Sequence, residues 1–228
     1  MDSSDERCFK DALYDEFSRI GKALSSGRRL EMLDVLARGE HTVAEVASAT
    51  GVSEANASQH LQTLRRARLV EGRKEGKYVY YSLADERVFR LWRALREVGE
   101  QQLAEVDRIV DEYRRSSDDL EPVGMEELLE RMRKGEAEAI DVRPEEEYRE
   151  GHIAGARSVP VDELAARAGE LPSDVEVVAY CRGPYCVLSD EAVETLREHG
   201  IEARRLEEGY PDWRAEGYPV DNPRSEAP

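Results

Sequence analysis

Cysteine is scarce in this chain, occurring three times in 228 residues. Such a small, odd number excludes the disulfide framework that holds small secreted domains together. Long apolar runs are also missing, since no stretch approaches the roughly 18 consecutive apolar residues of a membrane span. The chain starts MDSSDERCFKD, which is acidic and polar, whereas a secretory signal is basic and then apolar. We therefore expect a cytoplasmic protein that does not contact a membrane.

Positive charge is in short supply overall, but not everywhere. The chain holds 33 Lys and Arg against 50 Asp and Glu, a formal net charge of −17. Residues 1–115 carry 20 basic and 21 acidic side chains, whereas residues 116–228 carry 13 and 29. The segment from Arg65 to Lys77 still holds six basic residues against two acidic ones, and such a patch can lie on phosphates. For the second half, we interpret the acidity as a solubility feature that implies no partner.

The segment from Arg114 to Pro122, RRSSDDLEP, separates two hydrophobic patterns. Apolar residues before it recur with a helical period, and short strand-like runs after it alternate with helical stretches. We predict a mostly α-helical domain with a β-hairpin over 1–115 and a linker over 116–122. An α/β domain with a central parallel sheet follows over 123–222, and a short tail over 223–228.

Apolar residues near the end of the first half of the chain recur with a helical period. From Val88 to Tyr113, apolar residues recur every three to five positions, which predicts one long helix from Asp85 to Arg115. Its single apolar stripe can pack on its own domain and on a second copy of the helix, and the two packings are compatible. Because this helix leads into the linker, it is the candidate for carrying a signal between the domains.

Residues 41–83 combine two short helical patterns around Gly51 with the alternating stretch VEGRKEGKYVYYSL. This order predicts a helix-turn-helix followed by a β-hairpin wing, with Ser53 as the N-cap of the second helix. The polar face of that helix can hydrogen-bond base edges in a major groove, and the wing can reach the backbone or minor groove. The candidate DNA-contacting residues are Asn56, Ser58, Gln59, Gln62 and Arg66 on the helix and Arg73, Lys74, Lys77 and Tyr78 on the wing.

The chain from about Asp11 to Arg115 resembles the ArsR family of small dimeric repressors. The resemblance is carried, in order, by ALSSGRRLEMLDVL, TVAEVASATGVSEANASQHLQTLRRARLV and the wing ending VYYSL. It implies a homodimer on a palindromic operator DNA that an inducer releases. Metal-sensing members of the family carry a cysteine pair in the helix that here reads TVAEVASAT, where no cysteine occurs. The histidines and acidic residues also lack ligand spacing, so we expect no metal site and no cofactor.

Two of the three cysteines lie five positions apart in VAYCRGPYCVL, from Val178 to Leu188. Cys181 ends a strand-like run, and chemistry in parallel α/β sheets lies at the carboxyl ends of strands. Converging backbone N–H groups, the dipole of the following helix and the cation of Arg182 favour the thiolate form of this cysteine. A buried structural cysteine is the commoner alternative. The Gly-Pro turn after the strand favours a nucleophile.

The second half resembles a single rhodanese domain, through IDVRPEEEYREGHIAGARSVP, AYCRGPYC and GYPDWRAEGYPV. The resemblance implies that Cys181 carries sulfane sulfur as a persulfide, and that Asp141 and Arg143 lie on the supporting strand. Related phosphatases and arsenate reductases need an Arg six positions after the cysteine, where this chain has Val187, so oxyanion chemistry is disfavoured. The loop that cradles the sulfur comprises Arg182, Gly183, Pro184, Tyr185 and Cys186.

Cys186 departs from the ordinary rhodanese pattern. A thiol there could attack a persulfide on Cys181, release sulfide and close a disulfide, or trap a further sulfur. The favoured hypothesis is a homodimeric transcriptional repressor that senses or loads reactive sulfur through a Cys181 persulfide resolved by Cys186. Its partners are operator DNA and a sulfane-sulfur donor or acceptor, and sulfur loading alters operator binding. One alternative is a sulfurtransferase that turns over thiosulfate or a persulfide, with an attached DNA-binding domain. Another is a dithiol sensor of arsenite or a similar soft metalloid. The role of Cys8 is left open.

Overall fold

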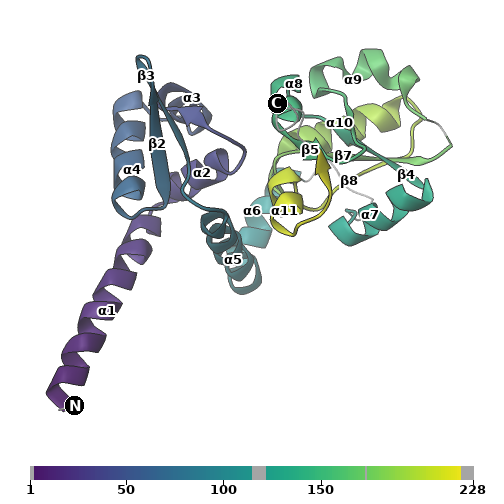
Figure 1. Ribbon diagram of the computed structural model, residues 1–228. Helices are drawn as coiled ribbons and strands as arrows, with labels where there is room; N and C mark the ends of the chain where they lie inside the picture. The colour runs from purple at the N-terminus through teal and green to yellow at the C-terminus, as the bar shows by residue number, and fades with distance from the viewer. Residues whose placement is uncertain (1–2, 115–121, 173, 222–228) are drawn as a thin grey trace. The chain divides into compact units, whose positions relative to one another are not determined.

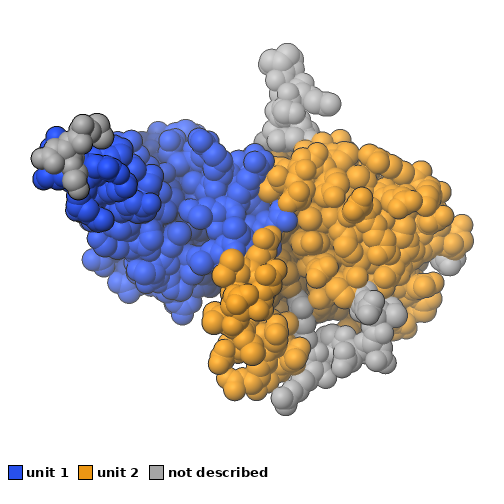
Figure 2. Space-filling view, turned by 90° about the horizontal axis from the view of Figure 1, so that it is seen from below, with its two compact units in different colours: residues 1–96 blue, residues 97–228 orange. Residues whose placement is uncertain are grey.

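The computed structural model describes residues 3–114, 122–172 and 174–221, and the chain divides into two compact units. Unit 1 comprises residues 1–96 and unit 2 residues 97–228 (Figure 2). The linker predicted over 116–122 lies outside the described residues except for Pro122, and so does the tail predicted over 223–228. Those domain boundaries therefore stay predictions. Within the described ranges, no helix has both the length and the apolar character needed to cross a membrane.

Unit 1 combines helices with a small antiparallel sheet (Figure 1). The strand order of this sheet is β1-β3-β2. Its elements are α1 (Ser3–Leu24), α2 (Gly27–Leu36), β1 (His41–Thr42), α3 (Val43–Ala49), α4 (Glu54–Arg66), β2 (Val70–Glu75) and β3 (Tyr78–Leu83). The hairpin pairs Glu75 with Tyr78 next to its turn, where Gly76 has a φ of +59°. Glycine adopts this left-handed conformation without steric cost. Together, α3, α4 and this hairpin confirm the predicted winged helix-turn-helix.

Local capping explains where the two helices of the motif begin. The Thr42 hydroxyl accepts from the Glu45 N–H at 3.3 Å, and the Thr42 N–H donates to the Glu45 carboxylate at 2.7 Å. This reciprocal capping box starts α3. The turn after α3 contains Gly51 at a φ of +62°, and Ser53 then caps α4 by accepting from the Asn56 N–H at 3.3 Å. Sequence signals that act over three or four residues therefore set this part of the fold.

Packing in the core of unit 1 determines which face of α4 is exposed to solvent. Met32 and Leu33 from α2 and Leu61 and Leu64 from α4 are almost completely buried, and Tyr81 of β3 packs in the same cluster. Burial of one stripe of α4 leaves the opposite stripe exposed.

The single helix predicted from Asp85 to Arg115 is wrong in one respect, because the structure divides it into α5 (Glu86–Gln102) and α6 (Ala104–Arg114). The break falls at Leu103, whose carbonyl accepts from the Val106 N–H at 2.8 Å and so starts the second helix. Gly99 lies in the last turn of α5, and glycine is a weak helix former. The apolar spacing continues across the break, so periodicity alone could not reveal it.

Unit 2 is an α/β unit with helices packed around a sheet (Figure 1). The sheet is parallel and has the order β6-β4-β7-β8. After α7 (Met125–Lys134), its elements are β4 (Ala137–Asp141), α8 (Glu145–Glu150), β5 (His152–Ile153), β6 (Arg157–Ser158), α9 (Val161–Arg167), a 3-10 turn (Ala168–Glu170), β7 (Glu176–Tyr180), α10 (Val187–Glu198), β8 (Ala203–Arg205), α11 (Tyr210–Ala215) and β9 (Val220–Asp221). The short strands β5 and β9 pair antiparallel outside the main sheet. This confirms the predicted α/β architecture.

Both faces of the sheet are covered, as is usual for parallel sheets. Leu164 of α9 and Leu196 of α10 belong to one buried apolar cluster, while Leu128 of α7 and Trp213 of α11 belong to another. The central strands β4 and β7 run in register, so that Asp141 is paired with Tyr180 at their carboxyl ends. Everything that directly follows these two strands therefore meets at one edge of the sheet.

Candidate functional site

The two neighbouring cysteines lie where β7 ends and α10 begins. Cys181 follows the last residue of β7, and Cys186 is the N-cap of α10. Their sulfur atoms form a disulfide across a Cα–Cα distance of 6.2 Å, which is in the ordinary range for such bonds. Cys181 is 1 % exposed, whereas Cys186 is half-buried. The fold therefore brings both sulfurs within bonding reach, which the sequence could only suggest.

The loop between the cysteines is held by its own backbone and by α11. The Cys186 N–H donates to the Gly183 carbonyl at 3.1 Å, and the Tyr210 N–H donates to the Cys181 carbonyl at 3.0 Å. Gly209, the N-cap of α11, faces the loop so closely that a Cβ there would collide with the backbone of Arg182 and Gly183. Gly209 was not predicted as a site residue, and its only local signal in the sequence is a glycine before the Tyr-Pro start of a helix.

Asp141 and Arg143 form a buried ion pair behind the loop. The Arg143 Nε donates to Asp141 Oδ1 at 2.9 Å, and Nη2 donates to Oδ2 at 2.5 Å and to the Gly151 carbonyl at 2.8 Å. The guanidinium also lies 4.6 Å from the centre of the Tyr210 ring. Burial lowers the pKa of Arg143, but the hydrogen bond and charge of Asp141, with smaller contributions from Tyr180 and Glu147, raise that pKa on balance. The pair therefore ties the end of β4 to the segment before β5 and to α11.

Tyr180, the last residue of β7, is buried beside this pair. Its hydroxyl oxygen accepts from the Ile153 N–H at 3.1 Å. Burial, and then the charge of Asp141, raise the pKa of the Tyr180 phenol well above its ordinary value. The phenol stays protonated, and the strand that carries Cys181 is fixed to β5.

Arg182, expected as a cation beside the thiolate, has a carboxylate partner. Its Nε lies 3.0 Å from both carboxylate oxygens of Glu147 on α8, and its Nη2 also donates to Glu147. The two side chains are 22 % and 21 % exposed. The charge of Arg182 is therefore compensated at the loop. The acidic run around Glu147 gave no sign in the sequence that this residue meets the loop.

The candidate DNA-contacting residues lie on two exposed surfaces of unit 1. On α4, Asn56, Gln59, Gln62 and Arg66 are exposed and Ser58 is half-buried. The wing residues lie on β2, on β3 or in the turn between them, and all are exposed: Arg73, Lys74, Lys77 and Tyr78.

Arg73 already has partners in the free protein. Its guanidinium lies 2.7 Å from Glu40 and 2.6 Å from Glu75. Exposed ion pairs of this kind contribute at most about 1 kcal/mol, so a DNA phosphate can replace either carboxylate at little cost.

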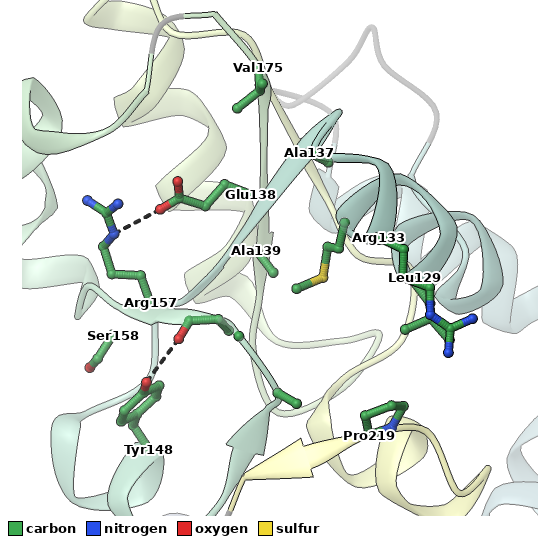
Figure 3. Close-up of a pocket in the computed structure, with 15 residues that line it drawn as sticks. Leu129, Arg133, Ala137, Glu138, Ala139, Tyr148, Arg157, Ser158, Val175 and Pro219 are labelled. Carbon is green, nitrogen blue, oxygen red and sulfur yellow. Dashed lines mark hydrogen bonds and ion pairs between the residues drawn. The ribbon is translucent and has the colours of Figure 1, made fainter.

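A separate cleft of about 790 Å³ lies elsewhere in unit 2. Figure 3 shows its wall, where Arg157 pairs with Glu138 at 2.8 Å and the Tyr148 hydroxyl donates to the Ala156 carbonyl at 2.9 Å. The lining residues come mainly from α7, β4, α8 and residues 154–158. This cleft is distinct from the cysteine loop, because none of its lining residues belongs to that loop.

The fold and the site define a two-domain DNA-binding regulator whose second domain is rhodanese-like. The family model described as "Bacterial regulatory protein, arsR family" matches residues 26–72, and the model of the rhodanese-like domain matches residues 124–216. The HTH-type transcriptional regulator Rv0324 of Mycobacterium tuberculosis is 46 % identical over 212 residues, covering 93 % of each chain. The chain belongs to the ArsR family of bacterial transcriptional regulators and carries a rhodanese-like domain.

Two further matches cover a smaller share of the chain. The transcriptional repressor SmtB homolog of Synechocystis is 44 % identical over 78 residues, which are 34 % of this chain and 59 % of that protein. A solution structure of a homodimeric winged helix-turn-helix domain from Mycobacterium bovis is 47 % identical, covering 41 % of this chain and 87 % of that one, with a TM-score of 0.40. Both family resemblances inferred from the sequence are confirmed by the family models and by the long match to Rv0324.

Proposed function

We propose that this protein is a cytoplasmic, homodimeric repressor whose rhodanese-like domain senses reactive sulfur through Cys181 and Cys186. The observation that carries the proposal is the placement of both sulfurs in one disulfide at the carboxyl end of β7. A disulfide there gives the domain two chemically distinct states, reduced and oxidised. The operator affinity of the DNA-binding unit is proposed to differ between them.

The chemistry proceeds in two balanced steps. The Cys181 thiolate attacks a sulfane sulfur of the donor, one S–S bond forms, and the donor's S–S bond breaks as its leaving group departs with the electron pair. The Cys186 thiolate then attacks the Sγ of Cys181, closing the disulfide, and the outer sulfur leaves as HS⁻ with the persulfide proton. The dithiol is oxidised by two electrons, and the sulfane sulfur is reduced to sulfide.

Operator binding is assigned to α4 and the wing. The exposed amides of Asn56, Gln59 and Gln62 can hydrogen-bond base edges in a major groove. Ser58 and Arg66 lie beside them on α4, while the wing residues Arg73, Lys74, Lys77 and Tyr78 can hold phosphates or the minor groove.

A second copy of the chain is the proposed occupant of two exposed apolar faces. Phe9, Tyr14 and Phe17 are exposed along α1, and Ile109 and Tyr113 are exposed along α6. Exposed apolar side chains that gather along a helix often mark an interaction surface. Two copies of the DNA-binding unit also suit a palindromic operator.

The short distance between the cysteines also suits a soft metalloid, since two thiolates can hold arsenite. A metalloid sensor can be distinguished from a sulfur sensor, because arsenite would bind to the two thiolates without any release of sulfide. The sulfurtransferase alternative requires repeated turnover, whereas disulfide closure stops the cycle until a reductant reopens the loop.

Replacing Cys186 with serine is expected to stop the reaction at the persulfide. After polysulfide treatment, the peptide that contains Cys181 should gain the mass of one sulfur in Cys186→Ser. The wild type should instead form the disulfide and release about one sulfide per chain more than Cys186→Ser does. Mass spectrometry of the peptides and a sulfide assay measure both products.

Cys8→Ser is the matched control, because Cys8 is an exposed free cysteine on α1. It should behave as the wild type does. Equal sulfide release from Cys186→Ser and the wild type, or an unmodified Cys181 in every variant, would contradict the proposed chemistry.

A further inference from the structure

Arg182 directly follows Cys181 in the sequence. Its guanidinium forms an ion pair with the carboxylate of Glu147. The guanidinium meets the carboxylate through Nε, at 3.0 Å from each oxygen, and through Nη2. Both side chains are about four-fifths buried, so water screens this pair less than it screens an open surface pair. The positive charge of the arginine that directly follows Cys181 is therefore compensated within the protein.

Two other guanidinium groups on elements that adjoin the loop are compensated too. Arg143 is paired with Asp141 in the buried pair, and Arg205, at the end of β8, lies 3.3 Å from Asp190 in the first turn of α10. On the loop itself, the Tyr185 hydroxyl donates to the carboxylate of Glu100. These residues together provide no excess positive charge around the sulfur.

We propose that Glu147 determines donor specificity: by neutralising Arg182, it makes the loop accept singly charged hydropolysulfides and discriminate against the thiosulfate dianion. This inference rests on the proposed sulfur loading of Cys181. With a hydropolysulfide, the donor's S–S bond breaks and its electron pair leaves on HS⁻ or a shorter hydropolysulfide. With thiosulfate, the same attack expels sulfite, which places two negative charges beside the loop. Only the second reaction needs a free cation.

The test measures how fast Cys181 gains sulfur when Glu147 can no longer compensate Arg182. Cys186→Ser serves as the parent, so that the persulfide stays on Cys181 for mass spectrometry. Glu147→Gln keeps a hydrogen-bond acceptor for Arg182 but removes the charge. We expect the rate with thiosulfate to rise about tenfold or more, since a dianion gains most from an uncompensated cation. The rate with polysulfide should change less than about threefold.

Two further variants serve as controls in this experiment. Glu146→Gln removes the same charge from the exposed neighbouring position of α8, and it should leave the donor preference unchanged. Adding Arg182→Gln to Glu147→Gln should abolish the gain with thiosulfate, because the freed cation is then gone.

The outcomes separate the inference from the function on which it rests. If neither donor loads Cys181 in the parent, the proposed sulfur chemistry fails, and the inference fails with it. If polysulfide loads Cys181 but Glu147→Gln changes the thiosulfate rate by less than twofold, only the inference is overturned. Equal acceleration with both donors would also overturn it.

Discussion

Asp141→Asn is expected to destabilise unit 2 by about 3–5 kcal/mol, because it leaves the buried Arg143 cation without a compensating charge. Both partners are almost completely buried, at 0 % and 1 % exposure, and the carboxylate accepts from Nε and Nη2 of the guanidinium. A neutral amide cannot accept two charge-assisted hydrogen bonds with both of its heavy atoms. Denaturant unfolding of the full chain measures the loss as a shift in the transition of unit 2.

The unfolding transition of unit 1 should not move, because the two units have separate hydrophobic cores. It therefore serves as an internal reference when the two transitions are fitted separately. Asp162→Asn makes the same chemical change at an exposed position of α9 and should cost less than about 0.5 kcal/mol. A loss below about 1 kcal/mol in Asp141→Asn would contradict a structural role for the buried pair.

Gly209→Ala is expected to displace the cysteine loop and to slow sulfur loading of Cys181 by about a hundredfold or more. The added Cβ would meet the backbone of Arg182 and Gly183, which cannot turn aside as a flexible side chain can. The steric cost should destabilise unit 2 by about 1–3 kcal/mol. The rate of disulfide closure with polysulfide and the denaturant midpoint measure the two effects.

Gly169→Ala is the matched control for this variant, because an added Cβ at Gly169 meets nothing within 4 Å. It should leave both the rate and the stability near the wild type. Wild-type loading in Gly209→Ala would show that the close approach of Gly209 does not position the loop.

Local signals explain why so much of the fold could be predicted. Ser53 and the period of α4 mark the second helix of the motif, and Gly76 between two alternating stretches marks the wing. These signals act within a few residues, so the sequence contains them directly. The break at Leu103 escaped prediction because the apolar spacing continues from α5 into α6.

The site could be predicted only where the chain itself brings residues together. Cys181 and Cys186 are five positions apart and were both predicted. Glu147 is separated from Arg182 by 35 positions, and Gly209 lies beyond α10 and β8 from the loop. The parallel sheet brings these residues together, and no sequence period records that approach. Neither residue could therefore be assigned to the site before the fold was known.

The central claim, that sulfur on Cys181 changes operator binding, is tested by fluorescence anisotropy with the protein's own promoter fragment at fixed salt. The reduced and the polysulfide-treated protein are titrated alongside Cys181→Ser treated in the same way. We predict that treatment shifts the wild-type affinity by about tenfold, or about 1.4 kcal/mol of coupling, and leaves Cys181→Ser unchanged. Equal affinity of both proteins before and after treatment would contradict the account.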